Sequence, residues 1–207
     1  MNIHIQNKEI WFENNPEIIE QLFNSINKYL QKDDLQFSHL IIDEEVIYDN
    51  FDNYIIENIE SINKIEVIAI TLTEMVNESL KSAEQYSKNA ITIINKTAEE
   101  FYQKPDENTW SQLTDLFEGI QWIIQSLTEI NSIESSYEVV SDYEIWNDYI
   151  QEVSKFNSII FELENAVLNK DNVLIGDMLL HEIIPIFEAM VEKLELLISE
   201  AVDKDVN

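Results

Sequence analysis

The sequence predicts an α+β fold that is mainly α overall. A small N-terminal ββαββαβ module, residues 1–71, is expected to precede an antiparallel up-and-down four-helix bundle, residues 72–207. Short β-branched runs separated by polar turns fill the first third of the chain, and apolar residues recur at helical spacing after it. The chain contains 2 glycines and 3 prolines, which favours long helices with short connections.

Two pairs of short apolar runs predict two β-hairpins in the N-terminal module. The four runs are residues 3–5, 10–12, 40–42 and 46–48. β-Branched and aromatic residues on either side of a few polar residues are typical of antiparallel strand pairs. Residues 65–70 predict a last strand. Trp11 and Tyr48 occupy similar places in the two hairpins, and both are expected in the core.

A helix is expected after each hairpin. Asn15 is suited to cap the first helix, with Pro16 at the first helical position, where the missing N–H costs no hydrogen bond. The second helix is expected over about residues 51–62. The two ββα units resemble each other, since Ile-Ile-Glu at 18–20 recurs at 55–57. This similarity indicates either an internal repeat or a chance likeness in a chain rich in isoleucine and glutamate.

Four helices are expected in the second part of the chain, over about residues 72–104, 107–131, 138–168 and 172–202. Thr71 and Glu74 have the spacing of a capping box at the start of the first. Pro105 ends that helix, and residues 131–137 are expected to form a loop. Pro185 is expected to kink the fourth helix, because proline lacks the N–H and clashes with the preceding turn.

Gly119 and Gly176 lie inside predicted helices, where glycine costs about 1 kcal/mol relative to alanine. Close packing of a neighbouring helix explains such a glycine, as would a helix boundary or a ligand groove. Trp110, Trp122 and Trp146 fall near apolar stripes and are expected in the core. If Trp122 lies off its stripe, it becomes an exposed anchor for a partner, since tryptophan is enriched at interface hot spots.

The charge of the chain excludes several classes of function. Its 12 lysines, with no arginine, face 41 carboxylates and give a formal net charge of -29. Repulsion from phosphate argues against direct binding to nucleic acid or to an anionic membrane. Because cysteine is absent, disulfides and thiolate metal sites are excluded. With no recognisable signal peptide or membrane span, the expected location is cytoplasmic.

No catalytic or cofactor-binding motif is recognised, so neither an enzyme nor a cofactor is expected. The chain has 3 histidines and no G-x-S-x-G sequence. Asp177 and His181 are four residues apart and therefore share a helix face, which Glu118 and Glu188 could approach. Together with Trp122, these residues form the predicted binding cluster. The Glu-x-x-His pairs of di-iron bundles are missing, so solvated side chains are the simpler interpretation and no metal is expected.

Two segments carry a resemblance to known proteins. Residues 176–188 read GDMLLHEIIPIFE, and residues 116–123 read LFEGIQWI. Together they resemble the helical part of an uncharacterised protein group from low-GC Gram-positive bacteria, mainly over residues 105–200. Because that group has no assigned activity, the resemblance implies a helical fold and no particular reaction.

Three functions from different classes stay open. The leading hypothesis is a non-enzymatic acidic protein-interaction module, an assembly or chaperone-like binder whose protein partner is unidentified and could be basic. The second is a nucleic-acid mimic that inhibits a basic protein, with carboxylates spaced like phosphates. The third is a metal-dependent or small-molecule-binding bundle that uses the predicted cluster. The charge also has a simpler explanation, since acidic surfaces improve solubility.

Overall fold

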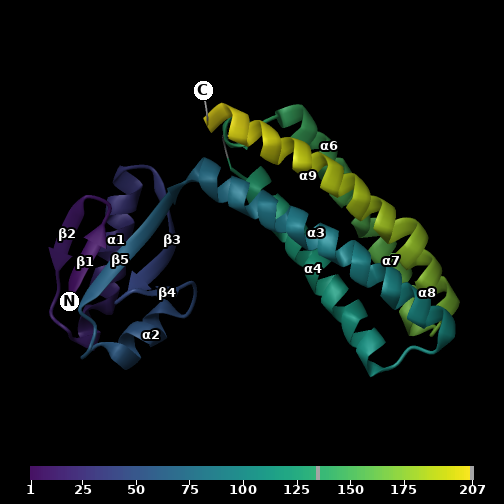
Figure 1. The fold of residues 1–207 in the computed structure, drawn as a ribbon, viewed down its shortest axis with the longest axis horizontal. Coiled ribbons are helices and arrows are strands. Elements are labelled where there is room, and N and C mark those ends of the chain that lie inside the picture. Colours follow the sequence, from purple (N-terminus) through teal and green to yellow (C-terminus); the bar gives the residue numbers. More distant parts are fainter. Residues whose placement is uncertain (134–135, 206–207) are drawn as a thin grey trace. The chain divides into compact units, whose positions relative to one another are not determined.

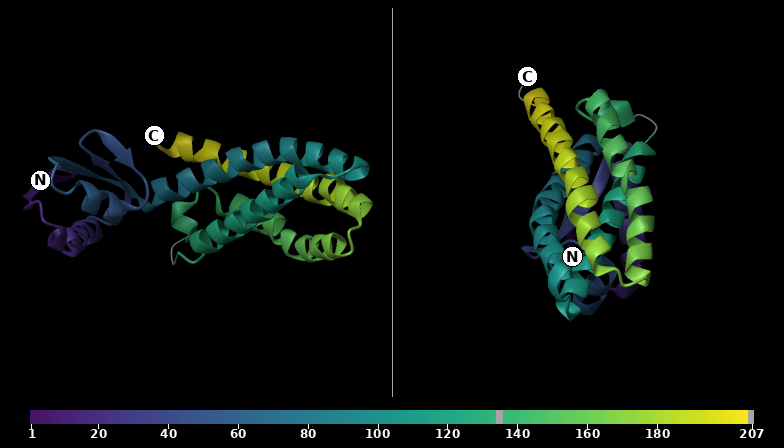
Figure 2. Two further views of the ribbon diagram at one scale, coloured as in Figure 1. Left: turned by 90° about the horizontal axis from the view of Figure 1, so that it is seen from below. Right: turned by 90° about the vertical axis from the view of Figure 1, so that its right-hand side faces the viewer.

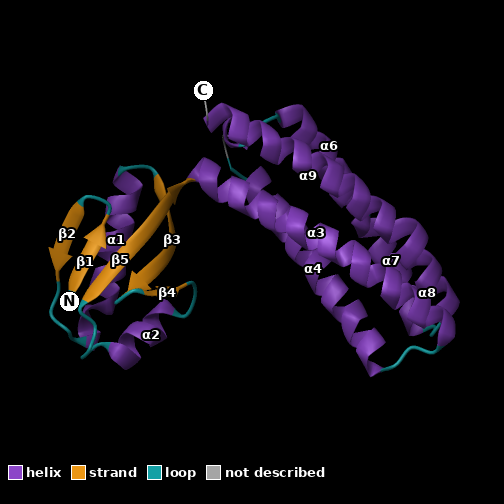
Figure 3. Ribbon diagram, viewed as in Figure 1, coloured by secondary structure: helices purple, strands orange, loops and turns teal. Residues whose placement is uncertain are grey.

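A computed structural model describes residues 1–133 and 136–205 of the protein. The predicted α+β, mainly α class is confirmed, since a five-stranded sheet is followed by helices (Figures 1 and 3). The chain separates into two compact units, residues 1–75 and 76–207.

The sheet of the N-terminal unit has the strand order β2-β1-β5-β3-β4. The strands are β1 Asn2–Ile5, β2 Lys8–Trp11, β3 Leu35–Ile42, β4 Glu45–Ile47 and β5 Lys64–Thr71. β1 and β5 are parallel, and the other neighbours are antiparallel (Figure 3). The predicted strands are all present, but β3 begins at Leu35 instead of residue 40. Pairing of Leu35 with Thr71 and of Phe37 with Ala69 extends it.

Two helical segments complete this unit. The short 3-10 turn η1 Pro16–Ile18 leads into α1 Ile19–Lys32, and α2 is Phe51–Asn58. The predicted cap is confirmed, because the Asn15 side chain accepts a hydrogen bond from the N–H of Glu17 at 3.0 Å. Alternate strand residues such as Ile3 and Leu40 pack with helix residues such as Leu22 into one buried core.

The prediction that Trp11 and Tyr48 lie in the core is wrong, since their side chains are 69% and 72% exposed. Ile10 pairs with the buried Ile3, so the alternation of a strand places Trp11 on the opposite face. Tyr48 follows the edge strand β4 and packs against His39, with 4.9 Å between ring centroids.

Asn14 links three parts of the N-terminal unit. Its amide donates hydrogen bonds to the carbonyls of Ile59 at 2.7 Å and Ile62 at 2.8 Å. Its side-chain oxygen accepts a hydrogen bond from the N-terminal ammonium of Met1 at 2.5 Å. One side chain thus joins the start of the chain, the segment after β2 and the segment after α2.

The second unit is helical, and its first helix, α3, begins four residues earlier, within the first unit. Its segments are α3 Leu72–Gln103, α4 Glu107–Asn131, α5 Ser136–Val139, α6 Tyr143–Ser154, α7 Phe156–Leu168, α8 Asn172–Met178, the π-helical turn η2 Leu179–Ile183 and α9 Ile184–Asp205. The capping box predicted for α3 is confirmed: Thr71 Oγ1 accepts from the N–H of Glu74 at 3.1 Å. The Glu74 carboxylate accepts in return from the N–H of Thr71 at 2.7 Å.

The continuous helix predicted over residues 138–168 is wrong. It is interrupted before Asp142, whose carboxylate accepts from the N–H groups of Glu144 at 2.7 Å and Ile145 at 2.9 Å and so starts α6. A second interruption, at Lys155, separates α6 from α7. Part of the loop expected over 131–137, residues 134–135, lies outside the described residues.

Directly before Pro185, where the sequence predicts a kink, the last helical segment is irregular. Proline has no N–H for the carbonyl of His181, one turn earlier. The chain forms the π-helical turn η2 directly before it, in which the N–H of Ile184 bonds to the carbonyl of Leu179. A π-turn accommodates the missing hydrogen bond without ending the segment.

Aromatic side chains fill the core of the helical unit. α6 packs along α9, and α7 packs along α8 (Figures 1 and 2). Trp146, Phe156 and Phe187 are fully buried, and within the described chain the indole N–H of Trp146 has no hydrogen-bond partner. Burial raises the pKa of the Tyr149 phenol. No helix in residues 1–133 and 136–205 is long and apolar enough to cross a membrane.

We expect Asn14→Ala to lower the free energy of unfolding of the N-terminal unit by about 1–3 kcal/mol, because it removes the donor to the carbonyls of Ile59 and Ile62 and one of the two acceptors of the Met1 ammonium. Urea denaturation of the full chain measures this loss. Asn53→Ala, at an exposed position of α2, is the matched control and should change stability by less than about 0.5 kcal/mol. Equal losses for both variants would contradict the role assigned to Asn14.

Candidate functional site

A groove of about 520 Å³ lies between α3 and α4. Ten residues line the groove: Tyr86, Asn89, Ala90, Ile93, Ile94, Thr97, Asn108, Gln112, Asp115 and Leu116. Its volume falls in the range of about 300–1,000 Å³ that is common for ligand sites.

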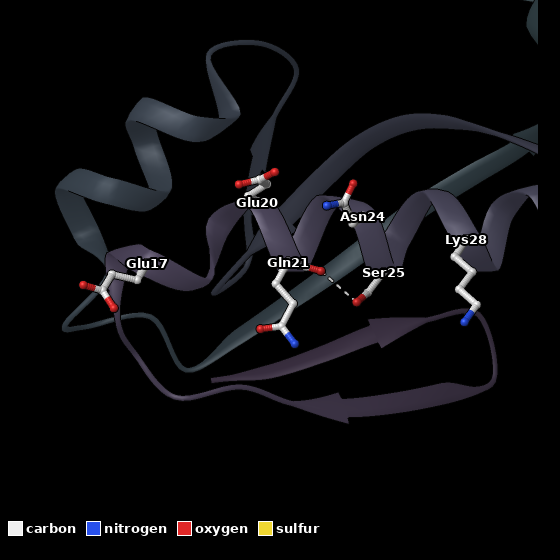
Figure 4. Close-up of a pocket in the computed structure, with 6 residues that line it drawn as sticks. All are labelled: Glu17, Glu20, Gln21, Asn24, Ser25 and Lys28. Carbon is white, nitrogen blue, oxygen red and sulfur yellow. Dashed lines mark hydrogen bonds between the residues drawn. The ribbon is translucent and has the colours of Figure 1, made fainter.

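A second hollow, of about 340 Å³, lies on the N-terminal unit (Figure 4). Six polar side chains from η1 and α1 line it: Glu17, Glu20, Gln21, Asn24, Ser25 and Lys28. Ser25 satisfies its hydroxyl locally by donating to the carbonyl of Gln21 at 2.7 Å. No apolar residue is among the six that line this hollow. The α3–α4 groove is the stronger candidate.

Helical spacing explains why these residues share the groove. The α3 positions 86, 90, 93 and 97 recur every three or four residues, as do the α4 positions 108, 112 and 115. Each helix therefore presents one continuous face to the other. The outermost lining positions of α3, 86 and 97, are eleven positions apart, so the groove is about 16 Å long at 1.5 Å per residue.

The floor of the groove is apolar and its rim is polar. Ala90, Ile94 and Leu116 are buried at the floor. The rim carries three amide side chains and one carboxylate, from Asn89, Asn108, Gln112 and Asp115. Ile93 is 49% exposed, a large share for an isoleucine beside a groove. An apolar floor with a few polar groups is the usual composition of a binding site.

Tyr86 and Gly119 form one end of the groove. A Cβ atom at Gly119 would lie 1.7 Å from the hydroxyl oxygen of Tyr86, so only glycine admits the phenol here. The close packing predicted at Gly119 is therefore confirmed, with an aromatic side chain as the neighbour. Tyr86 also contacts the ring of Trp122 edge-on, with 6.0 Å between centroids, and lies 6.2 Å from Phe187.

Polar contacts close the other end of the groove. The Thr97 hydroxyl is 2.7 Å from Gln112 Oε1 and donates to it, which joins α3 to α4. The buried Thr109 donates to Glu100 Oε2 at 2.8 Å. Beside them, Phe101 and Trp110 pack edge-to-face at 5.0 Å. These contacts hold the two helices together beyond the open stretch.

Asp106 starts α4 and thereby fixes one wall of the groove. Its carboxylate accepts from the N–H of Thr109 at 3.0 Å, and Thr109 Oγ1 accepts from the N–H of Asp106 at 3.1 Å. These two bonds form a capping box. The hydrogen bond from the N–H of Thr109 is the main reason why the pKa of the Asp106 carboxyl lies below its usual value.

The two walls of the groove differ in charge. Two of the three lysines of α3 have carboxylate partners: Lys88 pairs with Glu84 and Glu195, and Lys96 pairs with Glu100. On α4, Asp115 and Glu118 form no ion pair with any described residue. Burial raises the pKa of Tyr86, and the nearby Asp115 carboxylate adds to this effect. The α4 wall therefore carries uncompensated negative charge.

The five residues of the predicted binding cluster do not meet in one site. Trp122 is 39% exposed and borders the Tyr86 end of the groove. Glu118, one turn before it, is exposed on α4. His181 and Glu188 are exposed on η2 and α9, and Asp177 bonds to a residue of α3. In the described part of the chain, no group of three His, Asp or Glu residues could hold a metal ion.

Asp177 has a structural partner that its sequence position did not reveal. It accepts a hydrogen bond of 2.5 Å from the Tyr102 hydroxyl. The Tyr102 ring lies over Gly176, where a Cβ atom would be 2.9 Å from the ring. The close packing predicted at Gly176 is confirmed. This contact joins α3 to α8, and it raises the pKa of the Tyr102 phenol.

Sequence reasoning missed the groove. Asn89, Asn108, Gln112 and Asp115 are ordinary polar residues of amphipathic helices, and no motif distinguishes them. Gly119 was the one signal that α4 is approached closely, but it did not show which residue approaches. The groove lining, which lies wholly in described residues, includes no histidine, lysine, serine or cysteine.

A family model described as "Domain of unknown function (DUF8042)" matches residues 78–193. The chain belongs to this family. The DUF8042 segment includes every residue of the groove and most of the helical unit, and it overlaps the resemblance noted over residues 105–200. The description of the family assigns no activity. No curated protein and no solved structure matches the chain.

We expect Gly119→Ala to lower the free energy of unfolding by about 1–3 kcal/mol, because the new methyl group overlaps the Tyr86 phenol. In a Tyr86→Leu background the overlapping atoms are absent. There the same substitution should raise stability by up to about 1 kcal/mol, the helix-propensity difference. Urea denaturation of wild type, the two single variants and the double variant measures this reversal of sign. Stabilisation by alanine in both backgrounds would contradict the contact.

We expect the stability contributed by Asp106 to depend on pH. Because the pKa of this carboxyl is lowered in the folded state, its contribution is full above the unfolded value of about 3.9. It is lost as the pH falls through the lower folded value. The advantage of wild type over Asp106→Ala should therefore stay constant between about pH 7 and pH 5 and shrink below about pH 4. Urea denaturation across this pH range measures the free energies of unfolding of both proteins. If their difference is the same at about pH 2.5 as at pH 7, the expected pH dependence is wrong.

Proposed function

We propose that the protein is a non-enzymatic protein-interaction module whose α3–α4 groove receives a segment of a partner protein. The observation that carries the proposal is the groove itself, with its apolar floor of Ala90, Ile94 and Leu116 and its polar rim. We propose the cytoplasm as the place where this binding occurs.

The dimensions of the groove support a helical occupant. A length of about 16 Å corresponds to about three turns of an α-helix. A partner helix with apolar residues at three- and four-residue spacing would present about three side chains to the floor. Ile93 supports the same interpretation, because a half-exposed isoleucine at the rim gains from being covered.

The lining chemistry supports binding without catalysis. Asp115 and Tyr86 are the titratable groups of the lining, and the pKa of Tyr86 is raised away from neutral pH. Neither Asp115 nor Tyr86 is an activated nucleophile, because activation requires a neighbouring base or a lowered pKa. The amides of Asn89, Asn108 and Gln112 can instead donate to and accept from a bound backbone or side chain.

We expect peptides selected from a displayed random library against the full chain to bind in the groove. Ile93→Gln should weaken their binding about tenfold, equivalent to about 1.4 kcal/mol, because it removes apolar surface from the rim. Fluorescence anisotropy with labelled peptides measures the Kd values. The matched control is Ile56→Gln on α2, since the Ile56 side chain is 47% exposed and Ile93 is 49% exposed.

Two results would overturn this proposal. One is a library that yields no peptide with micromolar or tighter affinity for the full chain. The other is a set of peptides whose binding is equally affected by Ile93→Gln and Ile56→Gln, since binding would then not involve the groove.

A further inference from the structure

We infer that the segment bound in the α3–α4 groove is a cationic amphipathic helix, with a lysine or arginine that pairs with Asp115 beside apolar side chains over Ala90, Ile94 and Leu116. This inference rests on the proposed function and adds to it the chemistry of the partner. It depends on how charge is distributed around the groove, not on the net charge of the chain.

The first argument is the difference between the two walls. The carboxylates of α3 that flank the groove, Glu84 and Glu100, already pair with lysines of the same helix. α4 has four carboxylates and no lysine, so no partner is available within it. Asp115 and Glu118 pair with nothing in the described chain, which leaves two negative charges three residues apart on one wall.

The second argument is the position of Asp115 inside the groove. It lines the same cavity as the buried Leu116 and the Tyr86 ring, and it influences the pKa of that phenol. A neutral helix placed over the floor would remove water from this carboxylate and offer it no partner, which is costly. A cationic side chain at that point replaces the lost hydration with a charge-assisted hydrogen bond.

The third argument is the aromatic pair at the same end. Trp122 lies one turn after Glu118 on α4, and its ring is partly exposed beside Tyr86. A cation that reaches past Asp115 meets both a second carboxylate and an exposed indole. Arginine suits this position best, because a guanidinium can pair with a carboxylate and stack on an aromatic ring.

The test must separate this local recognition from general attraction, because a chain with a net charge of -29 attracts any cationic peptide. The probe is a labelled 18-residue helical peptide of leucine and lysine, with leucines at three- and four-residue spacing. Two further peptides carry glutamine or glutamate at every lysine position. Binding to the full chain is measured by fluorescence anisotropy at about 0.15 M salt, where attraction between distant charges is largely screened.

We expect the lysine peptide to bind, and the glutamine and glutamate peptides to bind at least tenfold more weakly. Asp115→Asn should weaken binding of the lysine peptide about fivefold, as expected for loss of one solvent-accessible ion pair. Glu188→Gln removes the same charge from an exposed position on α9 and should weaken binding less than twofold. Unequal effects of these two variants would support the inference.

Equal effects of Asp115→Asn and Glu188→Gln, or equal binding of the lysine and glutamine peptides, would overturn it. Ile93→Gln distinguishes this failure from failure of the proposed function. If that variant abolishes binding of peptides of every charge, the groove binds protein segments but does not select cationic ones. If Ile93→Gln and Ile56→Gln leave all binding unchanged, the groove does not bind segments, and both proposals fail.

Discussion

The contact between Tyr86 and Gly119 is the constraint on which the groove depends. The phenol occupies the space that any other residue at position 119 would fill, so α3 and α4 are in close contact at this point. Tyr86 is in turn held by the rings of Trp122 and Phe187, which extends the contact to α9. A single glycine thus fixes where the two helices meet, and the groove begins where that contact ends.

Polar contacts form a second connection between α3 and α4. The hydrogen bonds of Thr97 with Gln112 and of Thr109 with Glu100 join the helices at the far end. The groove of about 520 Å³ lies between the two joined ends. Apolar surface of Ile93, which is 49% exposed at the rim, stays uncovered by the protein's own residues, and covering it would supply binding free energy to a partner.

Structural elements that depend on neighbouring residues could be predicted from the sequence, whereas tertiary contacts could not. Strand runs, the Asn15 cap and the capping box at Thr71 depend on neighbouring residues, so the N-terminal elements follow from sequence. The exposure of Trp11 depends on which strand face meets the helices, which hydrophobicity does not reveal. The predicted cluster was based on the spacing of Asp177 and His181 within one helix. In the structure Asp177 instead accepts a hydrogen bond from Tyr102, which is far away in the sequence.

The acidic composition can be interpreted only once it is known which carboxylates have a lysine partner. A net charge of -29 is compatible with simple solubility, because carboxylates spread over exposed helix faces have no preferred partner. The pairs of Lys88 and Lys96 neutralise carboxylates along α3, while α4 has no lysine to do so. Specific recognition of a cation requires such a local imbalance beside an apolar surface, because long-range attraction does not discriminate between sites. Asp115 is the carboxylate at which both conditions are met.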